Sequence, residues 1–176
     1  KLIQVSERFR LNINEIASLS EKVFRPEGAI ELAANLQMMG GEFSRLGDPM
    51  TLMFKARNAP EELAKSIAKA AAESAIFNEE TGKFKLSALE MDRLKQVAEM
   101  TGQSMESLVE ASRADAREGK IAGQLAFTVE DEDKALLASA AKFKDGEFKI
   151  KLPGGDMVAM KNLTSTQLDA IRDNEK

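Results

Sequence analysis

Two short stretches interrupt a chain whose other segments have helical periodicity. They read FNEETGKF at 77–84 and FKDGEF at 143–148, and each places a phenylalanine on either side of a turn. Asp-Gly between two β-prone runs is a strong hairpin signal, and the first stretch fits a four-residue loop with Gly82 in a left-handed conformation. The pattern predicts two β-hairpins, which pair Phe77 with Phe84 and Phe143 with Phe148. Such interruptions favour a folded module over a continuous helical rod.

The second hairpin is predicted to extend into a meander. Apolar residues at 148, 150 and 152 alternate with lysines at 149 and 151, which is the period of a half-buried strand. Pro153-Gly154 suits a type II turn. The segment DMVAM at 156–160 is therefore expected to return as a third strand.

Capping residues and prolines mark the expected helix starts. Ser87 with Glu90, and Thr164 with Gln167, have the spacing of a capping box. Gly40-Gly41 and Thr101-Gly102 are expected to end helices, because glycine readily adopts C-cap conformations. The further expected starts are Asn12, Asp48-Pro49, Asn58-Ala59-Pro60, Ser104 and Thr128.

The fold class predicted from these signals is mainly α with small β-hairpin inserts, that is, α+β. We expect a helical module at 1–116 that contains the hairpin at 76–86, and a helix-hairpin-helix module at 128–176. The candidate linker is 117–127, because it overlaps the most polar part of the chain, SRADAREGKIAGQ at 112–124. Both halves read helix, hairpin, capping box, helix, which suggests a degenerate repeat about 65 residues apart.

Composition excludes several kinds of site. The chain has no cysteine and no histidine, so it cannot form a Cys/His zinc site or a Ser-His-Asp triad. The net charge of -4, with both signs mixed along the chain, argues against a sequence-specific nucleic-acid-binding face. Its uninterrupted apolar runs are far shorter than the ~20 residues of a membrane span. We expect no cofactor and no catalytic residue.

Two polar patterns are candidate sites. The run Glu130 to Asp133 offers oxygen ligands for a divalent cation, but it lacks the spacing of a calcium loop and is better interpreted as a charge-complemented helix start. Ser66 and Lys69 have the S-x-x-K spacing of some acyl-transfer enzymes, without the companion motifs. Neither is expected to act in catalysis.

Apolar residues are the candidates for protein contacts. Met38, Met39, Met50, Met53 and Phe54 could form an adaptable binding surface, although we favour their burial in the core. The hairpins could add strands to a partner's sheet, although we favour a packing role in which each phenylalanine pair fixes its hairpin on neighbouring helices. The contact candidates are Phe77, Phe84, Phe143, Phe148, Met50, Met53 and Phe54.

Residues 29–102 resemble segments of phage tail tape measure proteins and related large virion-internal proteins. The stretches that carry the resemblance are LQMMGGEFSRLGDP, LMFKARNAPEEL and FNEETGKFKLSALEMDRL. The resemblance implies a very long, mostly helical parent protein inside the tail tube, whose length sets tail length and which leaves ahead of the DNA. It also implies assembly in several copies and contacts with tail tube, tail tip or neck proteins.

We therefore expect a non-enzymatic structural segment that acts in tail assembly and genome ejection, is made in the host cytoplasm and resides in the virion. Two alternatives stay open: a helical accessory domain of a larger virion enzyme, and a bacterial adaptor protein. The chain begins KLIQVSERF, with neither an initiator methionine nor the apolar core of a signal peptide, so we expect an excerpt of a longer or processed polypeptide.

Overall fold

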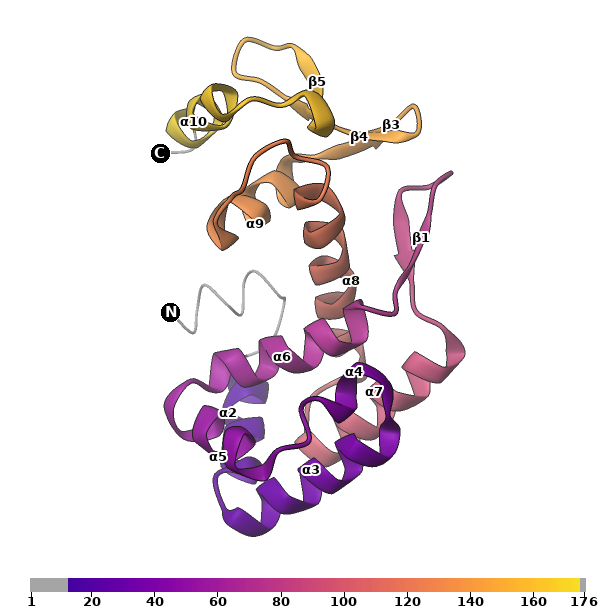
Figure 1. Cartoon of the computed structure of the whole chain (residues 1–176), viewed down its shortest axis with the longest axis vertical. Helices are drawn as coiled ribbons and strands as arrows, with labels where there is room; N and C mark the ends of the chain where they lie inside the picture. Colours follow the sequence, from indigo (N-terminus) through magenta and orange to yellow (C-terminus); the bar gives the residue numbers. More distant parts are fainter. Residues whose placement is uncertain (1–12, 175–176) are drawn as a thin grey trace. The chain divides into compact units, whose positions relative to one another are not determined.

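A computed structural model describes residues 13–174 of the chain (Figure 1). The fold is mainly helical with two small antiparallel sheets, which confirms the predicted α+β class. The chain forms two compact units, and each unit combines segments that are distant in sequence. The first unit holds the described residues up to 76 together with 85–115, and the second holds 77–84 together with the described residues from 116 onward.

The first unit is a helical bundle around an alanine- and leucine-rich core. Leu63, Ile67 and Ala71 of its α6 are fully buried and lie on one face of that helix. Alanines such as Ala64 and Ala68 allow the neighbouring helices to pack closely. The helices of this unit are α2 (Ile13–Val23), α3 (Pro26–Met39), α4 (Gly41–Ser44), α5 (Pro49–Asn58), α6 (Pro60–Ala72), α7 (Ala88–Thr101) and the first part of α8 (Met105–Ala122).

Most predicted helix starts in this unit are confirmed, with one correction. The Asp48 carboxylate accepts a hydrogen bond from the Thr51 amide at 2.8 Å, and the Ser87 hydroxyl accepts one from the Glu90 amide at 3.2 Å. Asn58 does not cap α6. It is the last residue of α5, and its side-chain amide donates to the Phe54 carbonyl instead. Asn12, the predicted cap of the first helix, lies outside the described residues.

The second unit surrounds a separate apolar core. This core contains Leu137, Phe148, Ile150, Met160 and Leu168. None of the helices between residues 13 and 174 combines the length and the apolar character that a bilayer crossing needs. The elements of the second unit are most of β1 (Ile76–Asn78) and of β2 (Lys83–Lys85), the end of α8, α9 (Asp131–Ala140), β3 (Lys142–Lys144), β4 (Glu147–Lys151), β5 (Met157–Ala159), η1 (Met160–Asn162) and α10 (Ser165–Asn174).

The two hairpin turns form as predicted. Gly82 has a φ of 67°, and the Asn78 side chain accepts hydrogen bonds from the Glu80 and Thr81 amides inside the loop. In the second hairpin Asp145 and Gly146 both have positive φ, which is the signature of a type I′ turn. The register there pairs Phe143 with Phe148, as predicted.

The predicted third strand is confirmed, because β5 pairs antiparallel with β4. The predicted type II turn before it is wrong. The positive φ belongs to Gly155, at 97°, and not to Gly154. The Gly155 amide still donates to the Leu152 carbonyl at 2.9 Å, so the turn closes with its left-handed residue one position later.

The structure differs from the predicted module boundaries in two respects. The hairpin residues 77–84 belong to the second unit and not to the module that precedes them in sequence. The expected linker at 117–127 is helical as far as Ala122, with Ile121 fully buried. The polar composition suggested a linker, but polar side chains of this part of α8 contact other residues of the second unit. Arg117 and Lys120, for example, lie against aromatic rings.

The two helix starts predicted for the second unit have different outcomes. Thr164 and Gln167 form the reciprocal capping box of α10, with hydrogen bonds of 3.0 and 3.3 Å. Thr128 caps no helix, since α9 begins at Asp131 with Glu130 at its N-cap. Three acidic residues occupy the first turn of α9, as expected for a helix start that complements the dipole.

Candidate contact surfaces

The four hairpin phenylalanines meet in one aromatic cluster within the second unit. The Phe77 ring lies 5.0 Å from the Phe84 ring and 5.8 Å from both Phe143 and Phe148, measured between ring centroids. Phe143 and Phe148 are 5.1 Å apart at a steep angle. Such tilted and edge-to-face pairs contribute ~0.5–1.5 kcal/mol each beyond their burial. The prediction places each pair on its neighbouring helices. Phe148 does share the apolar core of the unit with Leu137 of α9, and the two hairpins also pack against each other.

Glycine at position 82 allows this close packing. A Cβ atom there would overlap the Cβ and Cγ atoms of Phe143, so the first hairpin's turn lies directly on that side chain. Gly146, at the turn of the second hairpin, has open space around it. The conformation of Gly82 was predictable from its turn, but the contact that excludes a larger residue there was not.

Two basic residues of α8 cover the cluster. The Arg117 guanidinium lies 4.9 Å from the centroid of the Phe148 ring, and the Lys120 ammonium lies 4.6 Å from that of Phe77. Both distances are within the range of cation–π interactions. Sequence reasoning missed both residues, because the polar stretch that contains them suggested a linker. The signal present in the sequence was their spacing, which places them on adjacent parts of one helix face.

Arg117 also completes the end of α9. Its Nε donates to the Ala138 carbonyl at 3.1 Å, and a terminal nitrogen donates to the Ala141 carbonyl at 2.7 Å. These carbonyls lie where a helix leaves its last acceptors without partners. Burial lowers the pKa of Arg117 from its usual value, and the guanidinium remains protonated at neutral pH.

The methionine and phenylalanine candidates of the first unit divide into two groups. Met50 and Phe54, four residues apart on α5, are 67% and 65% exposed, and Met38 on α3 is 86% exposed. Their predicted burial in the core is wrong. Met39 and Met53 are half-buried and pack against the core. The sequence pattern could not separate the groups, because it does not show which face of α5 meets the bundle.

The exposed side chains of α5 stand opposite its buried face. Leu52 and Ala56 are both 2% exposed, and they anchor the helix in the bundle. Because i and i+4 positions lie on the same helix face, Met50 and Phe54 form a continuous apolar stripe on the solvent side. The adjacent helix α3 adds exposed Ile30 to the apolar surface of this unit. We call Met50 and Phe54 the α5 stripe.

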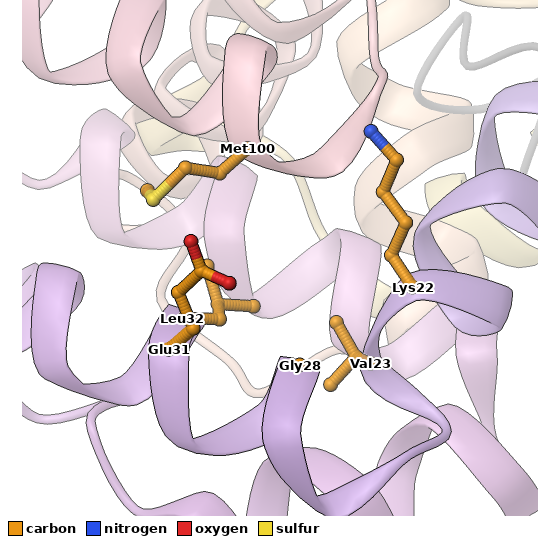
Figure 2. A pocket seen from close by; sticks show the side chains of 6 residues that line it. All are labelled: Lys22, Val23, Gly28, Glu31, Leu32 and Met100. Carbon is orange, nitrogen blue, oxygen red and sulfur yellow. The ribbon is translucent and has the colours of Figure 1, made fainter.

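A small cavity opens between α2, α3 and the end of α7. It has a volume of about 210 Å³, and Figure 2 shows the Lys22 side chain on one side of it and Glu31 with Met100 on the other. Its remaining lining residues are Val23, Gly28 and Leu32. The volume falls below the ~300–1,000 Å³ of common small-molecule sites. A Cβ at Gly28 would overlap the Lys22 carbonyl, so this glycine serves the close approach of the two helices.

The two polar candidate sites have structural roles. The Ser66 hydroxyl donates to the Glu62 carbonyl at 2.7 Å and accepts from the Lys55 ammonium at 2.9 Å. Its lysine partner therefore comes from α5 and not from Lys69. Within the run at 130–133, Asp133 pairs with Arg172 of α10. Among residues 13–174, no group of three or more acidic side chains is placed to hold a metal ion.

The Asp133–Arg172 pair joins the first turn of α9 to the last turn of α10. Asp133 is nearly buried, and both carboxylate oxygens accept hydrogen bonds from the guanidinium. These hydrogen bonds hold the pKa of Asp133 below its usual value, against the opposing effect of burial. The guanidinium also bonds Asp169 at 2.7 Å.

Comparison of the chain with models of protein families, with curated proteins and with solved structures finds no match.

Proposed function

We propose that the chain is a non-enzymatic structural segment of a phage tail tape measure protein or a related virion-internal protein. It acts through protein contacts in tail assembly and genome ejection. Its partners are tail tube, tail tip or neck proteins and further copies of the parent chain. It is made in the host cytoplasm and resides in the virion.

The observation that carries this proposal is the α5 stripe. Met50 and Phe54 expose large apolar side chains on a helix that Leu52 and Ala56 hold firmly in the bundle. Aromatic residues and methionine are enriched where proteins bind one another, because they bury much apolar area and methionine adapts to varied surfaces. The stripe also lies within residues 29–102, the range that resembles the tape measure proteins.

The contact that we propose is a helix face laid against another protein of the tail. Apolar residues at i and i+4 are the spacing with which an amphipathic helix fits a groove or a second helix. The buried face of α5 would stay unchanged on binding, so the first unit can dock as a preformed surface. Burying the exposed two-thirds of both side chains would contribute roughly 2–4 kcal/mol of transfer free energy before the costs of association.

Incorporation into phage particles tests the proposal. The parent gene would carry Phe54→Glu in the phage, with Thr51→Glu as the matched control, because Thr51 is also exposed on α5 but is polar. We expect mass spectrometry of purified particles to find wild-type and Thr51→Glu protein at equal levels. Phe54→Glu protein should be depleted at least tenfold, although the purified variant keeps its thermal stability, since surface substitutions change stability by only about ±0.5 kcal/mol.

Two results would overturn the proposal. One is the absence of the wild-type protein from purified particles, which would favour a bacterial adaptor. The other is normal incorporation and normal tails with Phe54→Glu, which would remove the α5 stripe from assembly. A catalytic activity that purifies with the parent protein would support the accessory-domain alternative instead.

A further inference from the structure

The first hairpin is a separate insert in the second unit. Residues 77–84 belong to that unit, while residues 76 and 85 on either side belong to the first. The chain therefore passes between the units at 76/77, at 84/85 and again at 115/116. An element that enters a unit from distant sequence is held there by noncovalent contacts, and not by continuity of the chain.

The surface that receives this hairpin is well defined. We call it the docking face, and it consists of Phe143, Phe148 and Lys120. Phe77 contacts all three: two rings at 5.8 Å between centroids and the Lys120 ammonium at 4.6 Å. The turn of the hairpin lies on Phe143 through Gly82. Aromatic packing thus accounts for the recognition.

The hairpin depends on this packing for its own stability. Its strands are three residues each, and a two-stranded hairpin of that size is marginal in water by itself. Short non-helical segments join it to the first unit, at residues 73–75 and 86–87. Release of the hairpin would therefore break one cluster of contacts and leave α6 and α7 intact.

We infer that the docking face also accepts the 77–84 hairpin of a second copy of the chain, so that two copies associate by exchanging hairpins. The exchanged hairpin makes the same contacts as the hairpin of its own chain, so exchange costs mainly the entropy of association. A high local concentration then shifts the balance toward the exchanged form. The inference rests on the aromatic cluster alone and is independent of the virion proposal.

Complementation between two damaged chains tests this inference. Phe77→Ser damages the hairpin and keeps the docking face, while Phe143→Ser damages the docking face and keeps the hairpin. Serine is neutral, so it forms no new ion pair with Lys120. Both chains carry Phe54→Glu, which prevents association through the α5 stripe. They are mixed with different affinity tags after warming to the onset of unfolding of the second unit.

We expect the mixed pair to form a one-to-one complex by light scattering, at least tenfold tighter than either variant mixed with a differently tagged copy of itself. In the complex, the Phe143→Ser chain supplies its hairpin to the Phe77→Ser chain. Amide exchange in α9 and α10 of the Phe77→Ser chain should slow at least tenfold on mixing. If Phe143→Ser aggregates, Phe143→Ala replaces it with the same expected order.

The inference is overturned if the mixed pair associates no more tightly than the like pairs at chain concentrations up to about 1 mM. It is also overturned if a mixed complex forms without slower amide exchange in α9 and α10, because the docking face would then be unoccupied. Either result leaves the incorporation experiment, and the virion proposal with it, unaffected.

Discussion

Alanine in place of Gly82 and of Gly146 gives a matched pair of perturbations. Both glycines have a left-handed backbone, with φ of 67° and 79°, and both lie at hairpin turns. An alanine at either position costs ~1–2 kcal/mol of backbone strain. At Gly146 the added methyl group meets open space, whereas at Gly82 it overlaps the Cβ and Cγ of Phe143. The Phe143 Cβ cannot leave by a rotamer change, since it is bonded directly to the backbone.

The two substitutions should therefore differ in the free energy of unfolding. Overpacking adds ~1–3 kcal/mol at Gly82, which gives a total of about 2–5 kcal/mol against about 1–2 kcal/mol for Gly146→Ala. Hydrogen exchange with mass spectrometry reads the two units separately. Amides of α9 and α10 that exchange through unfolding of the second unit should exchange about fivefold or more faster in Gly82→Ala than in Gly146→Ala, since each 1.4 kcal/mol is a factor of ten.

The reasoning behind this pair would be refuted by equal acceleration in both variants. It would also be refuted if Gly82→Ala accelerated exchange in α6 and α7 alone. In that case the first hairpin would stabilise α6 and α7, and its packing on Phe143 would contribute nothing measurable to the stability of the second unit.

Three further substitutions test other contacts of the second unit. Phe148→Ala should cost ~3–5 kcal/mol in chemical denaturation followed by circular dichroism, because the ring is 0% exposed. Arg117→Gln should cost ~2 kcal/mol and speed amide exchange at the end of α9, since it removes two hydrogen bonds to the Ala138 and Ala141 carbonyls; unchanged exchange there would count against this role. The pKa of Asp133 is lower in the folded protein than in the unfolded chain, where it is ~3.9. Its ion pair with Arg172 therefore stabilises the folded state at pH values above ~3.9, and this stabilisation is lost as the pH falls below that value. Asp133→Asn should lower stability at pH 7 by ~1 kcal/mol, a value discounted because Arg172 is 41% exposed. The variant should also lose less stability than the wild type as the pH falls below about 4; an unaltered acid profile would contradict the assignment.

Local chemistry explains the parts of the fold that the sequence predicted. Asp145-Gly146 and Gly82 specify their turns because few other residues adopt positive φ. Thr164 with Gln167 satisfies backbone donors within four residues of chain. Each of these signals acts over a short distance along the chain, so it can be recognised in the sequence without knowledge of the rest of the fold.

The features that were not predicted depend on contacts between distant residues. Phe77 and Phe148 are 71 positions apart, and nothing in either hairpin's own sequence shows that the other hairpin covers it. Arg117 was interpreted as part of a linker because its partners, the carbonyls at the end of α9, are backbone atoms that leave no trace in a sequence pattern. The repeated phenylalanine pairs were a usable signal, but only of similarity and not of contact.

The contact candidates of the first unit show a similar limit. Helical periodicity places Met50 and Phe54 on one face of α5, but burial depends on which face meets the bundle. That choice is made by Leu52 and Ala56 packing in the core. A sequence rule that assigns large apolar residues to the core therefore fails on the surface that we propose for binding.

The central structural claim is that both hairpins share one aromatic cluster, and proton NMR of selectively phenylalanine-labelled protein measures it most directly. With Phe77 assigned by substitution, the account predicts nuclear Overhauser effects from its ring protons to those of Phe143 and Phe148, whose centroids both lie 5.8 Å away. Cross-peaks from Phe77 to Phe84 but to neither Phe143 nor Phe148 would contradict the account and return each hairpin to its own half of the sequence.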